Sequence, residues 1–362
     1  MPNERIAIDA DGHVLESDEL FTDYLDPAYR GRTRGWALNE DNNRRFIVDG
    51  ICHPPHPKEI SSRKPMTAEN RIKVLDKERV QAAVLFPSAT TIATYLDPGF
   101  ADAMVRAHNS WIADYVKPYP DRLFFAAPVS INDIDSATAE ARRAVNDLGA
   151  VAIMVIPNPT EGRTLDRSEN NPFYAAVQEL GVPLILHEST GCQETLGGDR
   201  YGGMMDPPSY VYHHIVSHAF EQMFGAMSII AGGVLERFPS LRVGFFEAAC
   251  SWVPYWLARL DDHYLHPKLG PYLGGLTMKP SEYFERQCFV TCDPGDHTIP
   301  LAVQGIGSHK ILFSTDYPHF DSSGNAVNEF LALEGISNDE RQRILWDNAA
   351  TFFGLNLLVP TA

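Results

Sequence analysis

The stretch Arg5-Ile6-Ala7-Ile8-Asp9-Ala10-Asp11-Gly12-His13 joins a short apolar run directly to a group of acidic and imidazole side chains. Asp9, Asp11 and His13 are each two residues apart, and alternate residues of an extended chain lie on one face. We therefore expect Asp11 and His13 to project together beyond the C-terminal end of a first strand. A carboxylate and an imidazole in this position can bind one metal ion, although Asp-x-Asp-Gly also suits a polar turn after a strand.

Short apolar runs of this kind recur along the chain and alternate with longer amphipathic segments. Strands are expected at Arg5–Ile8, Ala82–Phe86, Leu123–Val129, Val151–Ile156, Leu184–Leu186, Leu241–Phe246, Phe289–Thr291 and Ile311–Phe313. Helices are expected at Ala68–Arg79, Phe100–Val116, Asp133–Asp147, Phe173–Leu180, His213–Glu236, Trp252–Tyr264, Leu301–Gly305 and Ser337–Phe352. Eight alternations predict an α/β fold, either a (β/α)8 TIM barrel or a doubly wound sheet. No G-x-G-x-x-G follows the first strand, so we favour the barrel.

We expect residues 1–362 to form a single barrel domain, because α/β barrels are often longer than other domains. Two connections are long: a long insertion, residues 16–66, follows strand 1, and a long loop, residues 188–212, follows strand 5. Connections after barrel strands lie on the C-terminal face, where barrel enzymes have their active sites. We therefore interpret both segments as active-site loops, with oligomer contacts as the alternative.

Polar side chains also follow three later strands at the same level. His187 comes directly after the fifth expected strand, and Asp316 comes shortly after the eighth. Glu247 is an even number of residues from Val243 and Phe245, so on a strand it should share their face, which we expect to point inward. Carboxylates buried this close together cost several kcal/mol each unless a cation neutralises them.

Asp11, His13, His187 and Asp316 are therefore expected to form one metal site. A set of two carboxylates and two imidazoles suits Zn²⁺, Mn²⁺ or Fe²⁺ better than Ca²⁺, which prefers oxygen ligands alone.

Motifs distributed over nearly the whole chain form a specific set. They are Ile8–Glu16, Arg71–Pro87, Leu186-His187, Gly233–Arg242, Glu247–Pro254, Arg259-Leu260-Asp261 and Ser314–His319. Together they resemble the amidohydrolase superfamily, in particular the amidohydrolase-related branch that includes the aminocarboxymuconate-semialdehyde, γ-resorcylate and carboxyvanillate decarboxylases. The resemblance implies a (β/α)8 barrel whose residues after strands 1, 5 and 8 bind a metal. It also implies a homodimer.

The chain departs from the family pattern at two positions. Many members carry His-x-His on strand 1, where this chain has Asp11-x-His13. Many members also end strand 6 in a histidine that assists the chemistry, where this chain has Glu247. A carboxylate at that position can act as a base or can bind a second metal ion.

His214 and His218 are four residues apart and share one face of an expected helix. Helical histidine pairs of this kind are often surface groups. If His218 joins Glu247, however, the site holds two metal ions and is rich in carboxylates. That arrangement suits two iron ions and O₂.

Two enzymatic functions follow from these residues. The first is a metal-dependent hydrolase or non-oxidative decarboxylase of a small carboxylic acid or cyclic amide, with Asp316, Glu247 and His218 as catalytic groups. The alternative is a diiron oxygenase that hydroxylates an apolar substrate, with Glu247 and His218 in the second metal site. A non-catalytic barrel would be expected to lack at least one ligand position, and all four positions are filled.

The composition restricts the partners. The chain has 30 Lys and Arg against 47 Asp and Glu, a net charge of −17, so it should repel nucleic acids and anionic membranes. Its five cysteines include no C-x-x-C pair, which favours free thiols in a reducing compartment. We expect a cytoplasmic protein that acts on a small molecule and needs no organic cofactor.

Overall fold

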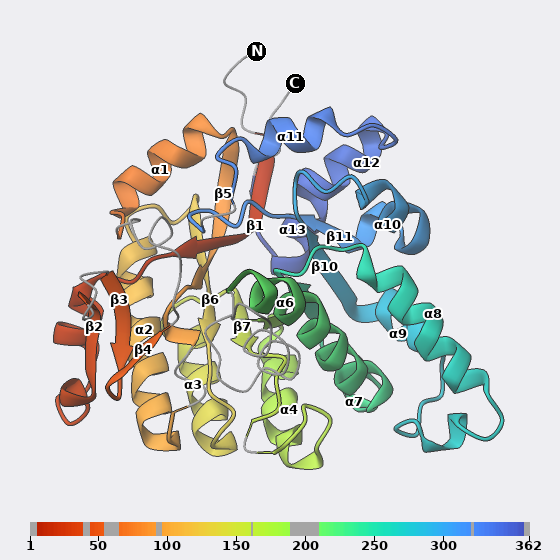
Figure 1. Ribbon diagram of the computed structural model, residues 1–362, viewed down its shortest axis with the longest axis horizontal. Coiled ribbons are helices and arrows are strands. Elements are labelled where there is room, and N and C mark those ends of the chain that lie inside the picture. The colour runs from red at the N-terminus through yellow and green to blue at the C-terminus, as the bar shows by residue number, and fades with distance from the viewer. Residues whose placement is uncertain are drawn as a thin grey trace.

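The computed structural model describes residues 6–38, 44–53, 65–91, 96–160, 162–188, 210–319 and 322–357. Its centre is an eight-stranded parallel sheet in which each strand pairs with the next strand of the sheet along the chain (Figure 1). The strands are β1 (Ala7–Val14), β5 (Val80–Pro87), β6 (Leu123–Pro128), β7 (Ala152–Val155), β8 (Leu184–His187), β9 (Val243–Phe246), β10 (Cys288–Cys292) and β11 (Ile311–Phe313). All eight overlap the predicted strands, and the predicted TIM barrel is confirmed.

The chain brings the first and last strands together next to their C-terminal ends. Asp316 N donates a hydrogen bond to Asp11 O over 3.0 Å, and His13 N donates to Tyr317 O over 2.8 Å. These bonds join the end of β1 to the turn that follows β11. The rim of the barrel is therefore continuous where the predicted metal ligands lie.

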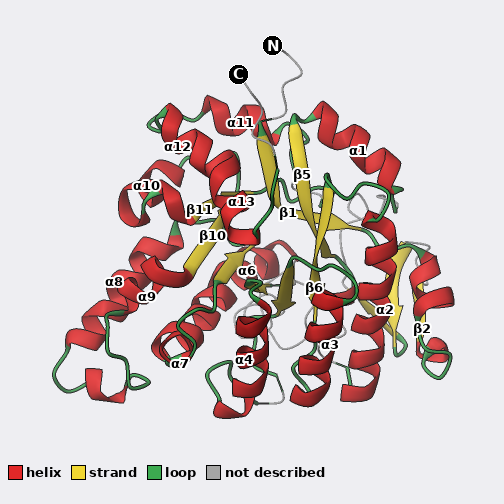
Figure 2. Ribbon diagram, turned by 180° about the vertical axis from the view of Figure 1, so that it is seen from behind, coloured by secondary structure: helices red, strands yellow, loops and turns green. Residues whose placement is uncertain are grey.

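Helices form an outer layer around the strands (Figure 2). They are α1 (Ala68–Lys77), α2 (Pro98–Val116), α3 (Ile134–Asn146), α4 (Asn171–Leu180), α6 (Tyr210–Ala226), α7 (Val234–Arg237), α8 (Trp252–Leu265), α9 (Pro280–Gln287), α10 (Ile299–Ile306), α11 (Ala326–Ala332), α12 (Asn338–Gln342) and α13 (Asn348–Phe353). Thr67, Asp97 and Asp133 cap α1, α2 and α3, because each side chain accepts a hydrogen bond from a backbone N–H of the first turn.

Two predicted helices are divided in the structure. The segment predicted as one helix over 213–236 consists of α6, a π-helical turn at Met227–Ala231, and α7. Gly233 interrupts it with a φ of 78°, a left-handed conformation that glycine adopts readily. The predicted helix over 337–352 likewise contains a π-helical turn, Arg343–Asp347, between α12 and α13. The sequence did not predict α9 and α11, which have only 8 and 7 residues and so little periodicity.

The insertion after strand 1 is confirmed and contains a second, smaller sheet. This sheet is antiparallel and consists of β2 (Thr33–Leu38), β3 (Arg44–Val48) and β4 (Ile51–His53). It lies beside α2 at the edge of the barrel (Figure 1). In the second predicted loop, 188–212, residues 189–209 lie outside the described residues. The active-site role of both segments stays a prediction.

The C-terminal helix α13 plugs the barrel at the end opposite the rim. Asn348 Nδ2 donates to Ile311 O at the start of β11, over 2.7 Å. Phe352 is fully buried and belongs to the apolar cluster that fills the barrel. Its ring contacts Phe246 and Phe289, with centroids 6.2 and 4.7 Å away. This end of the barrel therefore serves stability. No helix among the described residues combines the length and apolarity that crossing a membrane requires.

Replacing Phe352 with alanine should lower the free energy of unfolding by about 3–5 kcal/mol, because it leaves a cavity in the barrel core. Tyr272→Ala is the control, since that ring is 86% exposed and its loss should cost no more than about 0.5 kcal/mol. Denaturant unfolding of both variants gives the comparison. A Phe352→Ala protein as stable as the control would contradict the plug.

Candidate metal centre

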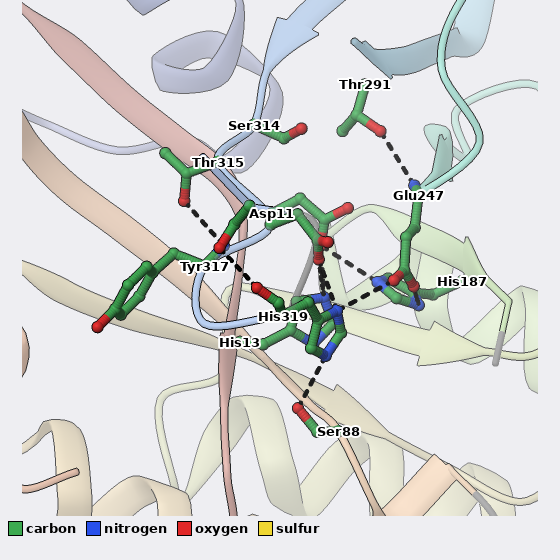
Figure 3. Close-up of polar contacts among 12 residues, drawn as sticks. Asp11, His13, Ser88, His187, Glu247, Thr291, Ser314, Thr315, Tyr317 and His319 are labelled. Atoms are coloured by element: carbon green, nitrogen blue, oxygen red, sulfur yellow. Dashed lines mark hydrogen bonds and ion pairs between the residues drawn. The ribbon is translucent and has the colours of Figure 1, made fainter. Parts of the chain in front are cut away.

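Side chains from the ends of four strands meet at the rim of the barrel (Figure 3). The structure brings together five of the six residues that the sequence singled out: Asp11, His13, His187, Glu247 and Asp316. The rest of the site is arranged around these five side chains.

A β-bulge in β1 determines which side chains of the first motif reach the rim. Asp9 pairs in register with Ala83 and Gly12 with Leu85, so β1 has one extra residue between them. The prediction that Asp9 shares a face with Asp11 and His13 is therefore wrong. Asp9 Oδ2 accepts a hydrogen bond from Thr315 Oγ1 over 2.7 Å and takes no part in either ligand cluster of the described residues.

Glu247 reaches the rim for a different reason from the one expected. Phe245 packs outward against Trp252 of α8, with ring centroids 5.9 Å apart, so the parity of β9 would turn Glu247 outward as well. Glu247 instead has a φ of 57° and redirects the chain. Asp316 has a φ of 52°. Each such backbone costs about 1–3 kcal/mol, and strain of this size is typical of functional sites.

One group of possible ligands contains Asp11, His13 and His187, whose ligand atoms lie within 4.8 Å of one another. His187 Nε2 is 3.2 Å from Asp11 Oδ1, and His13 Nε2 is 3.6 Å from the same oxygen. All three side chains are about 1% exposed. This group joins the end of β1 to the end of β8.

A second group contains His13, Glu247, Asp316 and His319. His319 Nδ1 lies 2.7 Å from Asp316 Oδ1 and 3.2 Å from Glu247 Oε1. The imidazole of His319 also stacks on that of His13, with centroids 3.9 Å apart. His319 lies within the Ser314–His319 motif but was not among the predicted site residues. Its spacing of three residues from Asp316 was the available signal.

Glu247 links the two groups. Its Oε1 faces His319, while its Oε2 lies 3.3 Å from His187 Nδ1. Burial alone would raise the pKa of Glu247, but the neighbouring imidazoles of His187, His218 and His319 hold it well below its ordinary value. Glu247 is therefore a carboxylate held between two rings.

His13 is oriented to offer a lone pair to a cation. Its Nδ1 lies 3.1 Å from Pro87 O, and a carbonyl can only accept, so Nδ1 carries the hydrogen. The buried Nε2 makes no hydrogen bond with any described residue and faces the carboxylate oxygens of Asp11 and Asp316, the latter at 3.3 Å. Burial lowers the pKa of His13 well below its ordinary value, so a proton does not fill this gap. A metal ion between these three acceptors fits.

The carboxylates also favour positive charge close to them. Burial by itself lowers the pKa of His187, but Asp11 and Glu247 raise it to about 9. Burial likewise lowers the pKa of His319, and Asp316 and Glu247 raise it well above its ordinary value. A divalent cation can supply the charge that these protons otherwise carry.

Gln222 of α6 fixes the strand ends on which two of these residues stand. Its buried Nε2 donates to Leu186 O over 2.8 Å and to Phe246 O over 2.9 Å. These carbonyls belong to the residues immediately before His187 and Glu247. One amide therefore sets the distance between the ends of β8 and β9.

His218 does not join either ligand group of the described residues. Its Nδ1 lies 3.3 Å from Glu188 Oε2, and Glu188 is buried directly after His187. His218 and His214 lie on one face of α6, as predicted, with ring centroids 4.7 Å apart. His218 therefore stands at the wall of the site.

A cavity of about 620 Å³ opens beside the ligand groups. Asp11, Glu247 and Asp316 form its floor, and His214 and His218 form part of its wall. Its volume lies in the range of small-molecule sites. Among the described residues that line this cavity there is no lysine or arginine.

Comparison with known proteins establishes the family. A family model described as Amidohydrolase, Amidohydro_2, matches residues 8–355. The chain belongs to this amidohydrolase family, as the sequence motifs predicted.

The individual relatives share only a modest part of their sequence with this chain. γ-Resorcylate decarboxylase from Polaromonas sp. strain JS666 is 26% identical over 305 residues, which cover 82% of this chain and 90% of the relative. A crystal structure of 5-carboxyvanillate decarboxylase from Sphingomonas paucimobilis aligns with a TM-score of 0.76 at 20% identity, covering 98% of this chain and 100% of the other. A dihydroxybenzoic acid decarboxylase from Polaromonas sp. JS666, solved with manganese and 2-nitroresorcinol, aligns with a TM-score of 0.70 at 22% identity, covering 98% of each chain. At these identities the two structures support the fold alone.

Replacing His187 with alanine should weaken the binding of Mn²⁺ by more than about tenfold, because even residues that only support metal ligands cost that much when changed. Metal content after reconstitution and dialysis gives the measurement. His309→Ala is the matched control, since His309 is exposed and pairs with Glu285 over 2.8 Å. Equal metal content in both variants would exclude His187 as a ligand.

Proposed function

We propose that this protein is a metal-dependent decarboxylase that releases CO₂ from a small aromatic acid. The observation that supports it most directly is the cluster of carboxylates and imidazoles at the barrel rim, whose carboxylates Asp11, Glu247 and Asp316 line the 620 Å³ cavity. The named relatives, which include a γ-resorcylate decarboxylase and a 5-carboxyvanillate decarboxylase, point to the same reaction class. Asp11, His13, His187 and Asp316 are the proposed ligands of one Mn²⁺, Zn²⁺ or Fe²⁺ ion.

The charge of the cavity implies that a carboxylate substrate would need a bound metal ion in order to enter the site. The described lining contains no lysine or arginine that could pair with an anion. Its floor is itself anionic, so a substrate carboxylate would be repelled unless a divalent cation lay between the two. When bound, that cation polarises the oxygen atoms of the substrate and holds them next to the acid–base groups.

The reaction needs one proton. As the bond between the ring and the carboxylate breaks, its electron pair stays on the ring carbon, CO₂ leaves, and a proton must be delivered to that carbon. Asp316, Glu247 and His218 line the cavity and are the proposed catalytic groups. His319 bridges Asp316 and Glu247 and can hold the proton that they share.

The geometry of the site does not support the two-iron alternative. It required His218 to complete a second site with Glu247, and His218 is paired with Glu188 instead. Hydrolysis of a cyclic amide would use the same metal and remains the second candidate for this family. Dimer formation and a cytoplasmic location stay predictions.

The Mn²⁺-loaded protein should release CO₂ from hydroxybenzoic acids such as 2,6-dihydroxybenzoate, and removal of the metal by a chelator should abolish the release. In D₂O the product should carry one deuterium on the carbon that lost the carboxylate. A panel that includes cyclic amides separates the two candidates. Amide hydrolysis without any CO₂ release would contradict the proposal.

Replacing His319 with glutamine should lower kcat by about 100-fold or more, since general acid–base groups contribute that much. The metal content should stay at the wild-type level, because the four proposed ligands are intact. Steady-state kinetics together with metal analysis test this. Unchanged kcat, or loss of the metal, would contradict the proton-holding role of His319.

A further inference from the structure

Asp9 and Arg71 form a buried ion pair behind the metal centre. Arg71 Nη2 lies 3.6 Å from Asp9 Oδ2, and the two side chains are 2% and 0% exposed. Arg71 belongs to α1, and Asp9 belongs to β1 just before its bulge. Neither residue belongs to the ligand groups found among the described residues. A buried charge pair of this kind adds little to stability compared with apolar packing, so it calls for another role.

The two side chains hold the residues on either side of Asp316. Asp9 accepts hydrogen bonds from Thr315 N over 2.9 Å and from Thr315 Oγ1 over 2.7 Å. Arg71 Nη1 donates to Tyr317 O over 2.8 Å, and its guanidinium lies 4.8 Å from the centre of the Tyr317 ring. Both neighbours of Asp316 are thereby fixed to the first strand and the first helix of the barrel.

Gly12 leaves the space that this pair occupies. A Cβ atom at Gly12 would lie 2.5 Å from Arg71 Nη2 and 2.6 Å from Asp9 Oδ2. The glycine therefore stands between Asp11 and His13 for a steric reason. The residue between the two ligands of β1 must be small for the pair behind them to form.

We propose that Asp9 and Arg71, with Gly12, are positioning residues that hold Asp316 in its strained, metal-binding conformation. The φ of 52° at Asp316 needs restraint from outside the residue, because it is unfavourable for a side chain other than glycine. The pair supplies that restraint on both sides. This inference rests on the proposed role of Asp316 as a metal ligand.

The test uses the double substitution Asp9→Asn/Arg71→Met, which removes both charges and leaves no unpaired ion in the core. We expect Mn²⁺ affinity to fall by about 10–100-fold, the usual effect of changing residues that support metal ligands. Thermal unfolding without metal should stay near that of the wild type. In the metal-saturated protein kcat should fall and KM should change little.

Two further variants keep the test decisive. Gly12→Ala leaves both charges in place but fills their space, and it should weaken Mn²⁺ binding by a similar factor even if the double variant does not fold. Glu140→Gln is the control: Glu140 is buried and pairs with Arg106 and Arg143 between α2 and α3. It should lower the unfolding temperature without changing Mn²⁺ affinity or kcat.

The outcomes separate the inference from the proposed function. Mn²⁺ affinity within about twofold of wild type in both the double variant and Gly12→Ala would overturn the positioning role, whatever the activity. A wild-type protein that binds Mn²⁺ but releases no CO₂ would overturn the decarboxylase proposal. The affinity comparison would still decide the positioning role in that case.

Discussion

The site depends on the electrostatic cost of placing Asp11, which is buried, beside Glu247 and Asp316, which are half-buried, at the rim of a closed barrel. Three carboxylates at this spacing repel one another, and burial removes the water that would screen them. Protonated imidazoles can balance part of this negative charge, and the carboxylates accordingly raise the pKa values of His187 and His319. A divalent cation would balance the negative charge more completely, because it binds several oxygens and nitrogens at once. We therefore propose that a metal ion completes the site.

The barrel holds these charged side chains in a defined geometry. Parallel strands bring their C-terminal ends to one rim, so residues 11 and 316 become neighbours across the closure of the barrel. Supporting groups then fix individual strand ends. Gln222 joins β8 to β9, and the Asp9–Arg71 pair holds both neighbours of Asp316. Rigid support of this kind keeps strained residues in place.

Much of the fold and of the site could be predicted from the sequence, because both depend on local patterns. Apolar runs located all eight strands, and the polar residues at or shortly after the ends of those runs identified Asp11, His13, His187 and Asp316 as residues that come together. The errors arose where the backbone leaves its regular period. The bulge in β1 turns the Asp9 side chain away from the site. Glu247 reaches the rim because of its positive φ, whereas the regular alternation of side chains along β9 would have turned it outward. His218 and His319 depended on tertiary packing, which spacing along the chain does not encode.

The most direct test of the metal centre is electron spin-echo spectroscopy of the purified protein reconstituted with Mn²⁺. The proposed site predicts one tightly bound ion per chain, and its signal should be modulated by the ¹⁴N nuclei of two directly coordinated histidines, His13 and His187. Mn²⁺ that binds only loosely, or that shows no nitrogen coupling, would contradict the claim that a cation completes this cluster of carboxylates and imidazoles.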